Sequence, residues 1–298
     1  MSEKSVHLVG IGDSVNHGLA NGERIFMGSA YGFAVGASLF AERGNVGIVT
    51  RIGDDLDYDP YETLRNDGID TTGVSVVKGG KTALLTIDED PKSHAWSFTV
   101  EDYGVAGQVD TASFPQSYLH AKHIHLATFH PERQLEWIAY LKSPDRFPGN
   151  PPTISVDLFL PFVEKFPAKS HAVASSADLV FINQDENRAM PETLIFSRIS
   201  AGRPMIVKTG RGGAYYVHDQ GAKFLGIHVP ATKVNVVDTT GAGEVLAGVY
   251  LAQRIRDIDR RIALRDAASV ASQVVTNYGI DHVRTLPRTN TVFKNNDI

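Results

Sequence analysis

Short apolar runs alternate with stretches of helical periodicity along most of the chain. The apolar runs predict buried strands at residues 7–9, 46–50, 123–127, 153–156, 179–182 and 204–207. Amphipathic stretches between them predict helices at residues 31–42, 60–66, 134–141 and 243–256. Strands that alternate with helices are typical of a mostly parallel sheet covered by helices, so the predicted fold class is α/β.

One N-terminal segment departs from this alternation. Residues 82–88 and 95–100 are alternating, β-prone runs, and the polar stretch 89–94 separates them. This pattern predicts an antiparallel hairpin rather than part of a β-α-β unit. Small β excursions of this kind are natural candidates for a lid over a substrate pocket, and the alternative is an edge hairpin with no gating role.

Length and composition limit the class of protein. The 298 residues are enough for one large α/β domain or for two modest ones. Hydrophobic residues make up 42% and charged residues 21%, which argues against a disordered chain. The net charge is −5 and no basic stripe is present, so we expect no nucleic-acid partner. No apolar run approaches the ~20 residues needed to span a bilayer, so we expect no membrane partner.

The chain has no cysteine. This excludes disulfides, thiolate metal sites and cysteine nucleophiles, and it agrees with a reducing cytoplasm. Residues 1–5 are polar and lead directly into the first predicted strand, so we see no export signal. The expected location is therefore cytoplasmic.

The stretch from Val236 to Gly248 is the most informative for chemistry. An apolar strand end at Val236 and Val237 is expected to meet two threonines and a small-residue turn, after which an amphipathic helix follows. Glycine permits a tight turn, and the first helical turn leaves N–H groups unpaired. Those donors and the helix dipole favour an anionic oxygen such as a phosphate, and Glu244 is placed to accept a proton. The alternative is a plain strand-to-helix turn.

The string Asp238-Thr239-Thr240-Gly241-Ala242-Gly243, followed by an acid and Gly248, resembles the C-terminal signature of the ribokinase-like (PfkB) carbohydrate kinases. The resemblance implies one ribokinase-like domain over residues 1–298, with a β lid from roughly residues 14–30 and 80–102. It also implies an ATP-dependent kinase that transfers the γ-phosphoryl group to a hydroxyl of a sugar, a sugar derivative or a nucleoside. Gly241, Ala242 and Gly243 would form the anion hole, and Glu244 would be the general base.

Glu244 departs from the family pattern, in which the base is Asp. Glutamate is one methylene longer, so a different rotamer or a shifted helix must place its carboxylate. A misplacement of about 1 Å can lower the rate by on the order of a hundredfold. The alternative function is therefore a homologue with weak or lost catalysis that acts as a ligand-binding or regulatory protein.

Two further strand ends resemble nucleotide-side elements of the family. Asn183-x-x-Glu186 follows one predicted strand and resembles the element that holds Mg²⁺ largely through water, with a helix cap as the alternative. Gly210 and Gly213 follow another strand and would contact ATP, with an ordinary hairpin turn as the alternative. The resemblance assigns four more residues to the nucleotide side: Lys208, Asp238, Thr240 and Asn277.

The substrate end departs most from the family. Its members usually carry a Gly-Gly turn followed shortly by Asn, and an Asp soon after the first strand, and both contact sugar hydroxyls. The corresponding candidates in this chain are Asp13, Asn16, Gly28, Ser29 and Phe33. The turn at Gly28 is not followed by the Asn that the family usually carries there. Asp157 is a further pocket candidate because it follows the strand 153–156. Phe33 and Tyr31 make an unusual, more aromatic acceptor credible.

The resemblance also indicates cofactors and partners. ATP, Mg²⁺ and a small hydroxylated substrate are expected, while activation by K⁺ and a homodimer through the β lid stay open. A dinucleotide-dependent oxidoreductase is a less favoured alternative, because Gly18 lies too far from Gly10-x-Gly12 for the usual fingerprint. His123 and His125 alternate along a predicted strand, where strand and pocket-wall roles are favoured over a metal site.

Overall fold

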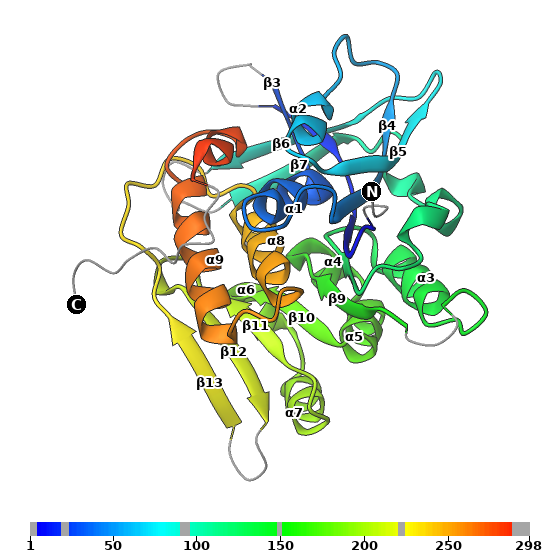
Figure 1. Cartoon of the computed structure of the whole chain (residues 1–298). Coiled ribbons are helices and arrows are strands. Elements are labelled where there is room, and N and C mark those ends of the chain that lie inside the picture. The colour runs from blue at the N-terminus through cyan, green and yellow to red at the C-terminus, as the bar shows by residue number, and fades with distance from the viewer. Residues whose placement is uncertain (1–4, 19–23, 90–95, 148–150, 220–223, 288–298) are drawn as a thin grey trace.

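A large, mostly parallel sheet forms the centre of the molecule (Figure 1). The computed structural model describes residues 5–18, 24–89, 96–147, 151–219 and 224–287, and within them nine strands follow the order β13-β12-β11-β10-β9-β8-β1-β4-β5. These strands are β1 (Leu8–Ile11), β4 (Val46–Gly53), β5 (Asp70–Val77), β8 (His123–Leu126), β9 (Thr153–Asp157), β10 (Leu179–Asn183), β11 (Met205–Lys208), β12 (Ala214–Asp219) and β13 (Phe224–Val229). Every pairing from β11 to β5 is parallel, whereas β12 and β13 extend the β11 edge antiparallel. The predicted α/β class is confirmed.

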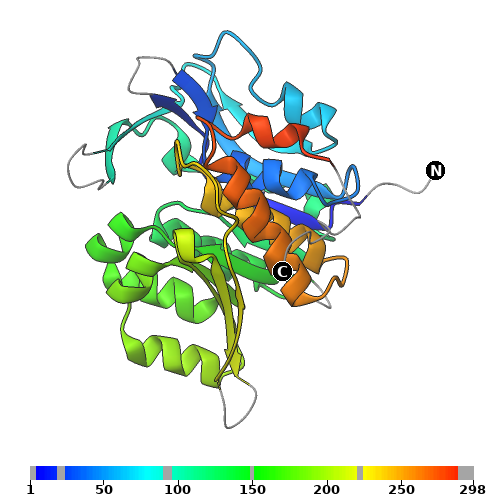
Figure 2. The ribbon, with the colours of Figure 1, turned by 90° about the vertical axis from the view of Figure 1, so that its left-hand side faces the viewer.

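Helices cover both faces of this sheet (Figures 1 and 2). One group comprises α1 (Ser29–Ser38), α8 (Ala242–Arg254) and α9 (Arg260–Val274), with α2 (Glu62–Asn66) beside β5. The other comprises α3 (Pro131–Leu141), α4 (Leu160–Lys165), α5 (Pro167–Ser176), α6 (Gln184–Ala189) and α7 (Glu192–Ser200). Successive strand residues enter opposite cores, as Val180 and Phe181 do, because side chains alternate across a strand. Among the described residues, no helix is long and apolar enough to cross a membrane.

A second, four-stranded sheet is present in the described part of the chain, in the order β3-β2-β6-β7. It consists of β2 (Val15–Gly18), β3 (Arg24–Met27), β6 (Ala83–Glu89) and β7 (Trp96–Asp102). The β6–β7 pairing is antiparallel, which confirms the predicted hairpin, and β2 joins β6 in parallel. This small sheet falls in the two segments predicted to supply the lid.

The other predicted strands and helices are present, with ends shifted by a few residues. The strand expected to end at Val237 is wrong, because the structure has no strand between Val229 and the start of α8. Val236 and Val237 are each 39% exposed, and the Val237 N–H donates to the Val275 carbonyl at 2.7 Å instead of pairing with a sheet neighbour. The apolar pair therefore lies along the end of α9.

Helices α1 and α8 touch through their backbones. A Cβ atom added to Gly36 would lie 2.3 Å from the Val245 carbonyl oxygen, and one added to Gly248 would lie 2.1 Å from the Phe33 carbonyl oxygen. Side chains at these positions would push the two helices apart. Glycine therefore sets the separation of α1 and α8, and with it the position where α8 begins.

We expect Gly248→Ala to destabilise the protein although alanine is the better helix former. The added methyl group must displace the α1 backbone, which costs about 1–3 kcal/mol of unfolding free energy for an overpacked site. Urea unfolding would measure this loss. Gly226→Ala is the matched control, because no atom lies within 4 Å of its Cβ position, and it should stay near the wild type. A Gly248→Ala protein as stable as the wild type would contradict the close contact.

Candidate active site

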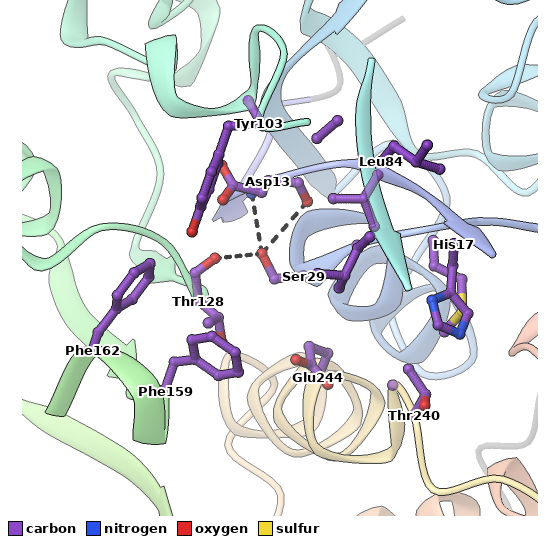
Figure 3. Close-up of a pocket in the computed structure, with 17 residues that line it drawn as sticks. Asp13, His17, Ser29, Leu84, Tyr103, Thr128, Phe159, Phe162, Thr240 and Glu244 are labelled. Carbon is purple, nitrogen blue, oxygen red and sulfur yellow. Dashed lines mark hydrogen bonds between the residues drawn. The ribbon is translucent and has the colours of Figure 1, made fainter. Parts of the chain in front are cut away.

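A cavity of about 160 Å³ lies where the central strands end, beneath the small sheet (Figure 3). Asp13 reaches it from the segment after β1, Thr128 from the segment after β8, and Phe159 from the segment after β9. Strands β2 and β6 and the first turn of α8 also contribute to its lining. Ligands of parallel α/β sheets bind at this edge, outside the carboxyl ends of the strands.

The start of α8 presents helix amides toward this edge. Gly241 is the N-cap residue, with φ of 81° in the left-handed region, and no side chain caps the helix. The Asp238 carboxylate shapes the preceding turn, because its Oδ1 accepts from the Thr240 N–H at 2.9 Å and from the Thr240 hydroxyl at 2.7 Å. Glu244 lies in the first turn and lines the cavity together with Thr240 and Gly241. The positive end of the helix dipole therefore faces the site.

A buried ion pair stands beside this turn. Lys208 at the end of β11 donates through Nζ to both carboxylate oxygens of Asp157 at the end of β9, each at 2.7 Å. Asp157 is 1% exposed. A Cβ atom added to Gly243 would lie 3.0 Å from Lys208 Nζ, so the ammonium group lies directly against the first turn of α8.

Three carboxylates share this one ammonium group. Burial raises the pKa of Glu186 to about 8, although Lys208 opposes the rise. Burial and the nearby Asp157 raise the pKa of Glu244 as well. Burial alone would lower the pKa of Lys208, but Asp157, Glu186 and Glu244 outweigh it and the pKa is raised. The cluster therefore keeps its cation charged and makes its carboxylates more basic than usual.

Asp13 is a second unusual carboxylate. Its Oδ1 is buried and has no hydrogen-bond partner among the described residues, and burial raises its pKa to about 7. Its backbone is fixed by Ser29, whose hydroxyl accepts from the Asp13 N–H at 3.1 Å and donates to the Thr128 carbonyl at 2.9 Å. Gly28 permits this arrangement, because its φ is 121° and an added Cβ would lie 2.5 Å from the Asp13 carbonyl oxygen.

The structure brings many of the predicted residues together. The predicted residues that line the cavity are Asp13, Gly28, Ser29, Thr240, Gly241 and Glu244. Ala242 and Gly243 continue the same helical turn. Asn16 and Phe33 do not line the cavity, and the Phe33 ring is fully buried against His125 at a centroid distance of 4.9 Å. Asn277 is exposed, and its side chain accepts from the Tyr278 N–H.

Asn183 and Glu186 form a capping box at the start of α6. The Asn183 Oδ1 accepts from the Glu186 N–H at 2.8 Å, and the Glu186 Oε2 accepts from the Asn183 N–H at 2.7 Å. The helix-cap alternative thus accounts for their local geometry, while Glu186 also belongs to the buried cluster. No group of three or more His, Cys, Asp or Glu in the described residues could hold a metal ion. A cation here would depend on water and on ligand oxygens.

Gly210 and Gly213 lie in the turn between β11 and β12. Their φ angles are 55° and 91°, and an added Cβ at Gly213 would lie 2.0 Å from the Val229 carbonyl oxygen. The hairpin alternative therefore explains Gly213 sterically. Around Gly210 nothing lies within 4 Å of the Cβ position, so this side of the turn has room for a ligand.

Several lining residues were not found from the sequence. Phe159 and Phe162 follow β9, so the strand-end rule that selected Asp157 was the available signal. Tyr103 and His17 reach the cavity only because the small sheet folds over it. His123 and His125 both hydrogen-bond to the Ser155 hydroxyl inside the sheet, which agrees with strand roles.

The comparisons with known proteins define the family. A family model described as pfkB family carbohydrate kinase matches residues 4–285. The chain belongs to the pfkB family of carbohydrate kinases. It is similar to a cytidine kinase of Thermococcus kodakarensis, at 26% identity over 271 residues, which cover 87% of this chain and 91% of the relative.

Solved structures share the ribokinase-like fold. An archaeal nucleoside kinase of the ribokinase family from Methanocaldococcus jannaschii has a TM-score of 0.73 at 18% identity, covering 94% of this chain and 97% of its own. An E. coli protein described provisionally as a ribokinase II, in complex with ATP and Mg²⁺, has a TM-score of 0.74 at 20% identity, covering 94% and 96%. At these identities the likeness concerns the fold.

We expect Lys208→Met to destabilise the protein strongly, because it leaves the buried Asp157 carboxylate without its cation. Removing one partner of a buried ion pair typically costs about 3–5 kcal/mol of unfolding free energy. Adding Asp157→Asn to this variant removes the uncompensated charge and should restore much of the loss. Urea unfolding at pH 7 would measure both proteins. A double variant as unstable as Lys208→Met alone would contradict a dominant role of the ion pair.

We expect Asp13→Asn to change how stability depends on pH. The folded-state pKa of Asp13, about 7, exceeds its ordinary value of 3.8, so the contribution of this group to stability is full below that value and is lost as the pH rises through about 7. The asparagine variant lacks this loss and should gain stability relative to the wild type between pH 4 and pH 8. Thermal unfolding across this range is the measurement, and parallel curves would contradict the raised pKa.

Proposed function

We propose that this protein is an ATP-dependent phosphotransferase that transfers the γ-phosphoryl group to a hydroxyl of a small metabolite. One observation carries the proposal: Glu244 lies in the first turn of α8 and lines the cavity, with the Lys208 ammonium against the same turn. Glu244, which can accept a proton, and the positive charge of Lys208 thus lie at the same turn beside the cavity. Family membership supports the kinase activity.

Glu244 is the proposed general base. Its carboxylate would accept the proton of the acceptor hydroxyl as that oxygen attacks phosphorus. Its raised pKa suits this role, because a base is most effective when its pKa lies near the working pH. The additional methylene of glutamate is compatible with the role because the side chain lines the cavity.

The first turn of α8 and Lys208 would stabilise the transferred group. The backbone amides of residues 241–243 and the dipole of a 13-residue helix favour negative charge at this point. Lys208 adds a full positive charge beside Gly243. Phosphoryl transfer depends mainly on positioning and electrostatics, so backbone amides and one ammonium group are the kinds of group that this reaction needs.

The residues of the neighbouring strand ends fit a nucleotide with its metal ion. Gly210 lies in a turn with open space beside it, and Glu186 supplies a buried carboxylate near Lys208. Bound Mg²⁺ would neutralise phosphate charge, and Asn183 and Glu186 would hold its water ligands. The E. coli structure with ATP and Mg²⁺ supports this assignment. Gly213, Asp238, Thr240 and Asn277 on the nucleotide side, and activation by K⁺, remain predictions.

The acceptor is proposed to be a sugar, a sugar derivative or a nucleoside. The relatives include a cytidine kinase, and the structural neighbours include a nucleoside kinase and a ribokinase. The small sheet would act as a lid, since β2 and β6 contribute to the cavity wall. A cytoplasmic location and a homodimer through this sheet remain predictions of the sequence.

We expect Glu244→Gln to lower the turnover number by roughly 100-fold or more, because general base catalysis contributes about 10²–10⁴ to such rates. ATP binding and the unfolding temperature should be preserved. ADP release with Mg²⁺ and K⁺ over a panel of sugars and nucleosides would measure turnover. The matched control is Glu192→Gln, which alters an exposed acid in the first turn of α7.

Unchanged turnover in Glu244→Gln would remove this residue from the role of base. A wild-type protein that binds ATP calorimetrically, turns over none of the acceptors and gains activity with Glu244→Asp would favour the alternative. It would then be a binding or regulatory homologue that has lost efficient catalysis.

A further inference from the structure

The flanks of the cavity differ in chemistry. The carboxylates of Asp13 and Glu244 and the hydroxyl of Thr240 are among the polar groups that line it (Figure 3). Three aromatic side chains, Tyr103, Phe159 and Phe162, lie along one flank in the same view, and we call them the aromatic flank. A ligand that fills this cavity must therefore have a polar part and an apolar part.

The aromatic flank is built from two separate elements. Phe159 and Phe162 come from the segment after β9 and from α4, and their rings meet edge to face at a centroid distance of 5.4 Å. The ring of Phe162 also contacts the ring of His130, at a centroid distance of 5.4 Å. Tyr103 follows β7 of the small sheet and is 47% exposed. Aromatic rings from the segment after β9, from α4 and from the segment after β7 thus border the same cavity, which suits a flat ligand group.

The charge of the lining excludes anionic acceptors. Asp13 and Glu244 are the carboxylates, and no Lys or Arg is among the described residues that line the cavity. His17 is buried, and burial lowers its pKa, so it offers no positive charge near neutral pH. Lys208 is held by Asp157 outside this lining. A sugar acid or a sugar phosphate would therefore be repelled, and a neutral molecule is favoured.

One unpaired acceptor in the lining, Asp13 Oδ1, favours a ligand with hydroxyl donors. Asp13 Oδ1 is buried without a partner in the described structure, and an ionised carboxylate only accepts hydrogen bonds. The hydroxyls of a sugar satisfy it. Against the rings of Phe159 and Phe162 the same hydroxyls would lose water and find no partner, which is unfavourable. A free sugar carries hydroxyls around its whole ring, whereas a nucleoside carries them on one part and a flat base on the other.

We propose that the acceptor is a neutral nucleoside whose sugar hydroxyls meet Asp13 and Glu244 and whose base lies on the aromatic flank. Phe162 and Tyr103 are then specificity-determining residues. This inference rests on the proposed function and narrows its acceptor class.

A substrate comparison with ATP and Mg²⁺ tests the class directly, with cytidine, uridine, adenosine, D-ribose and D-gluconate as acceptors. Stacking of a base on an aromatic side chain is worth roughly 5- to 100-fold in affinity. The kcat/KM of the best nucleoside should therefore exceed that of D-ribose by at least about fivefold, with no turnover of D-gluconate. A preference for D-ribose or D-gluconate overturns the inference and leaves the kinase assignment standing.

Phe162→Ala tests the aromatic flank. It should raise the KM for the best nucleoside by roughly 5- to 100-fold while the KM for ATP and for D-ribose stay near the wild-type values. Phe162→Leu keeps the apolar volume and guards against misfolding, and thermal unfolding would verify both proteins. Phe196→Ala, at a 53% exposed position on α7, is the control. An unchanged nucleoside KM in both Phe162 variants overturns the inference.

A calorimetric titration separates this inference from the proposed function. If no acceptor is phosphorylated, the kinase assignment fails, but the wild-type protein can still be titrated with the nucleosides and with D-ribose. Tighter binding of a nucleoside, weakened in Phe162→Ala, supports the inference. Equal binding of D-ribose, or no nucleoside binding, overturns it.

Discussion

The backbone contact between α1 and α8 is the constraint on which the site depends. Because Gly36 and Gly248 bring the helices together, the first turn of α8 lies against Lys208 at the end of β11. The same surface of α1 also contacts Glu244, the proposed base. A Cβ atom added to Gly32 would lie 2.9 Å from the Cβ of Glu244, so any side chain there would take the space beside the glutamate stem. Glycine at position 32 therefore leaves room for the side chain of the acid at position 244.

The buried carboxylates around Lys208 favour proton acceptance but lower stability when they are ionised. Asp157, Glu186 and Glu244 surround one ammonium group, and if all three were ionised the cluster would carry excess negative charge. Desolvation opposes that state, which is why the carboxylate pKa values rise. Such a cluster would repel an isolated phosphate, but it suits a phosphate that brings its own cation.

The sequence predicted the adjacent parallel strands from β11 to β4, because such strands are buried on both faces and form continuous apolar runs, as Val180 and Phe181 do. It did not predict β5 and β13, which lie at the two edges of the sheet. The hydrophobic pattern did not predict β2, a short strand that contains Asn16 and His17 and pairs with β3 and β6. Only the family resemblance placed a β lid at residues 14–30. The turn before α8 and Glu244 were found because glycine spacing is a local signal. Phe33 was assigned to the pocket from its neighbours in sequence, but its face of α1 turns into the core.

The departures from the family pattern at the substrate end fall outside the strands of the central sheet. The charge of the site comes from groups at the ends of parallel strands and on α8. Lys208 and Asp157 are examples, and the central sheet fixes their positions. The shape and polarity of the cavity depend on segments that cross over it, including Tyr103 from the small sheet. A change in the second set would alter which molecule fits without moving the groups proposed to act on phosphate. This explains how a chain with a clear kinase signature can differ so much at its substrate end.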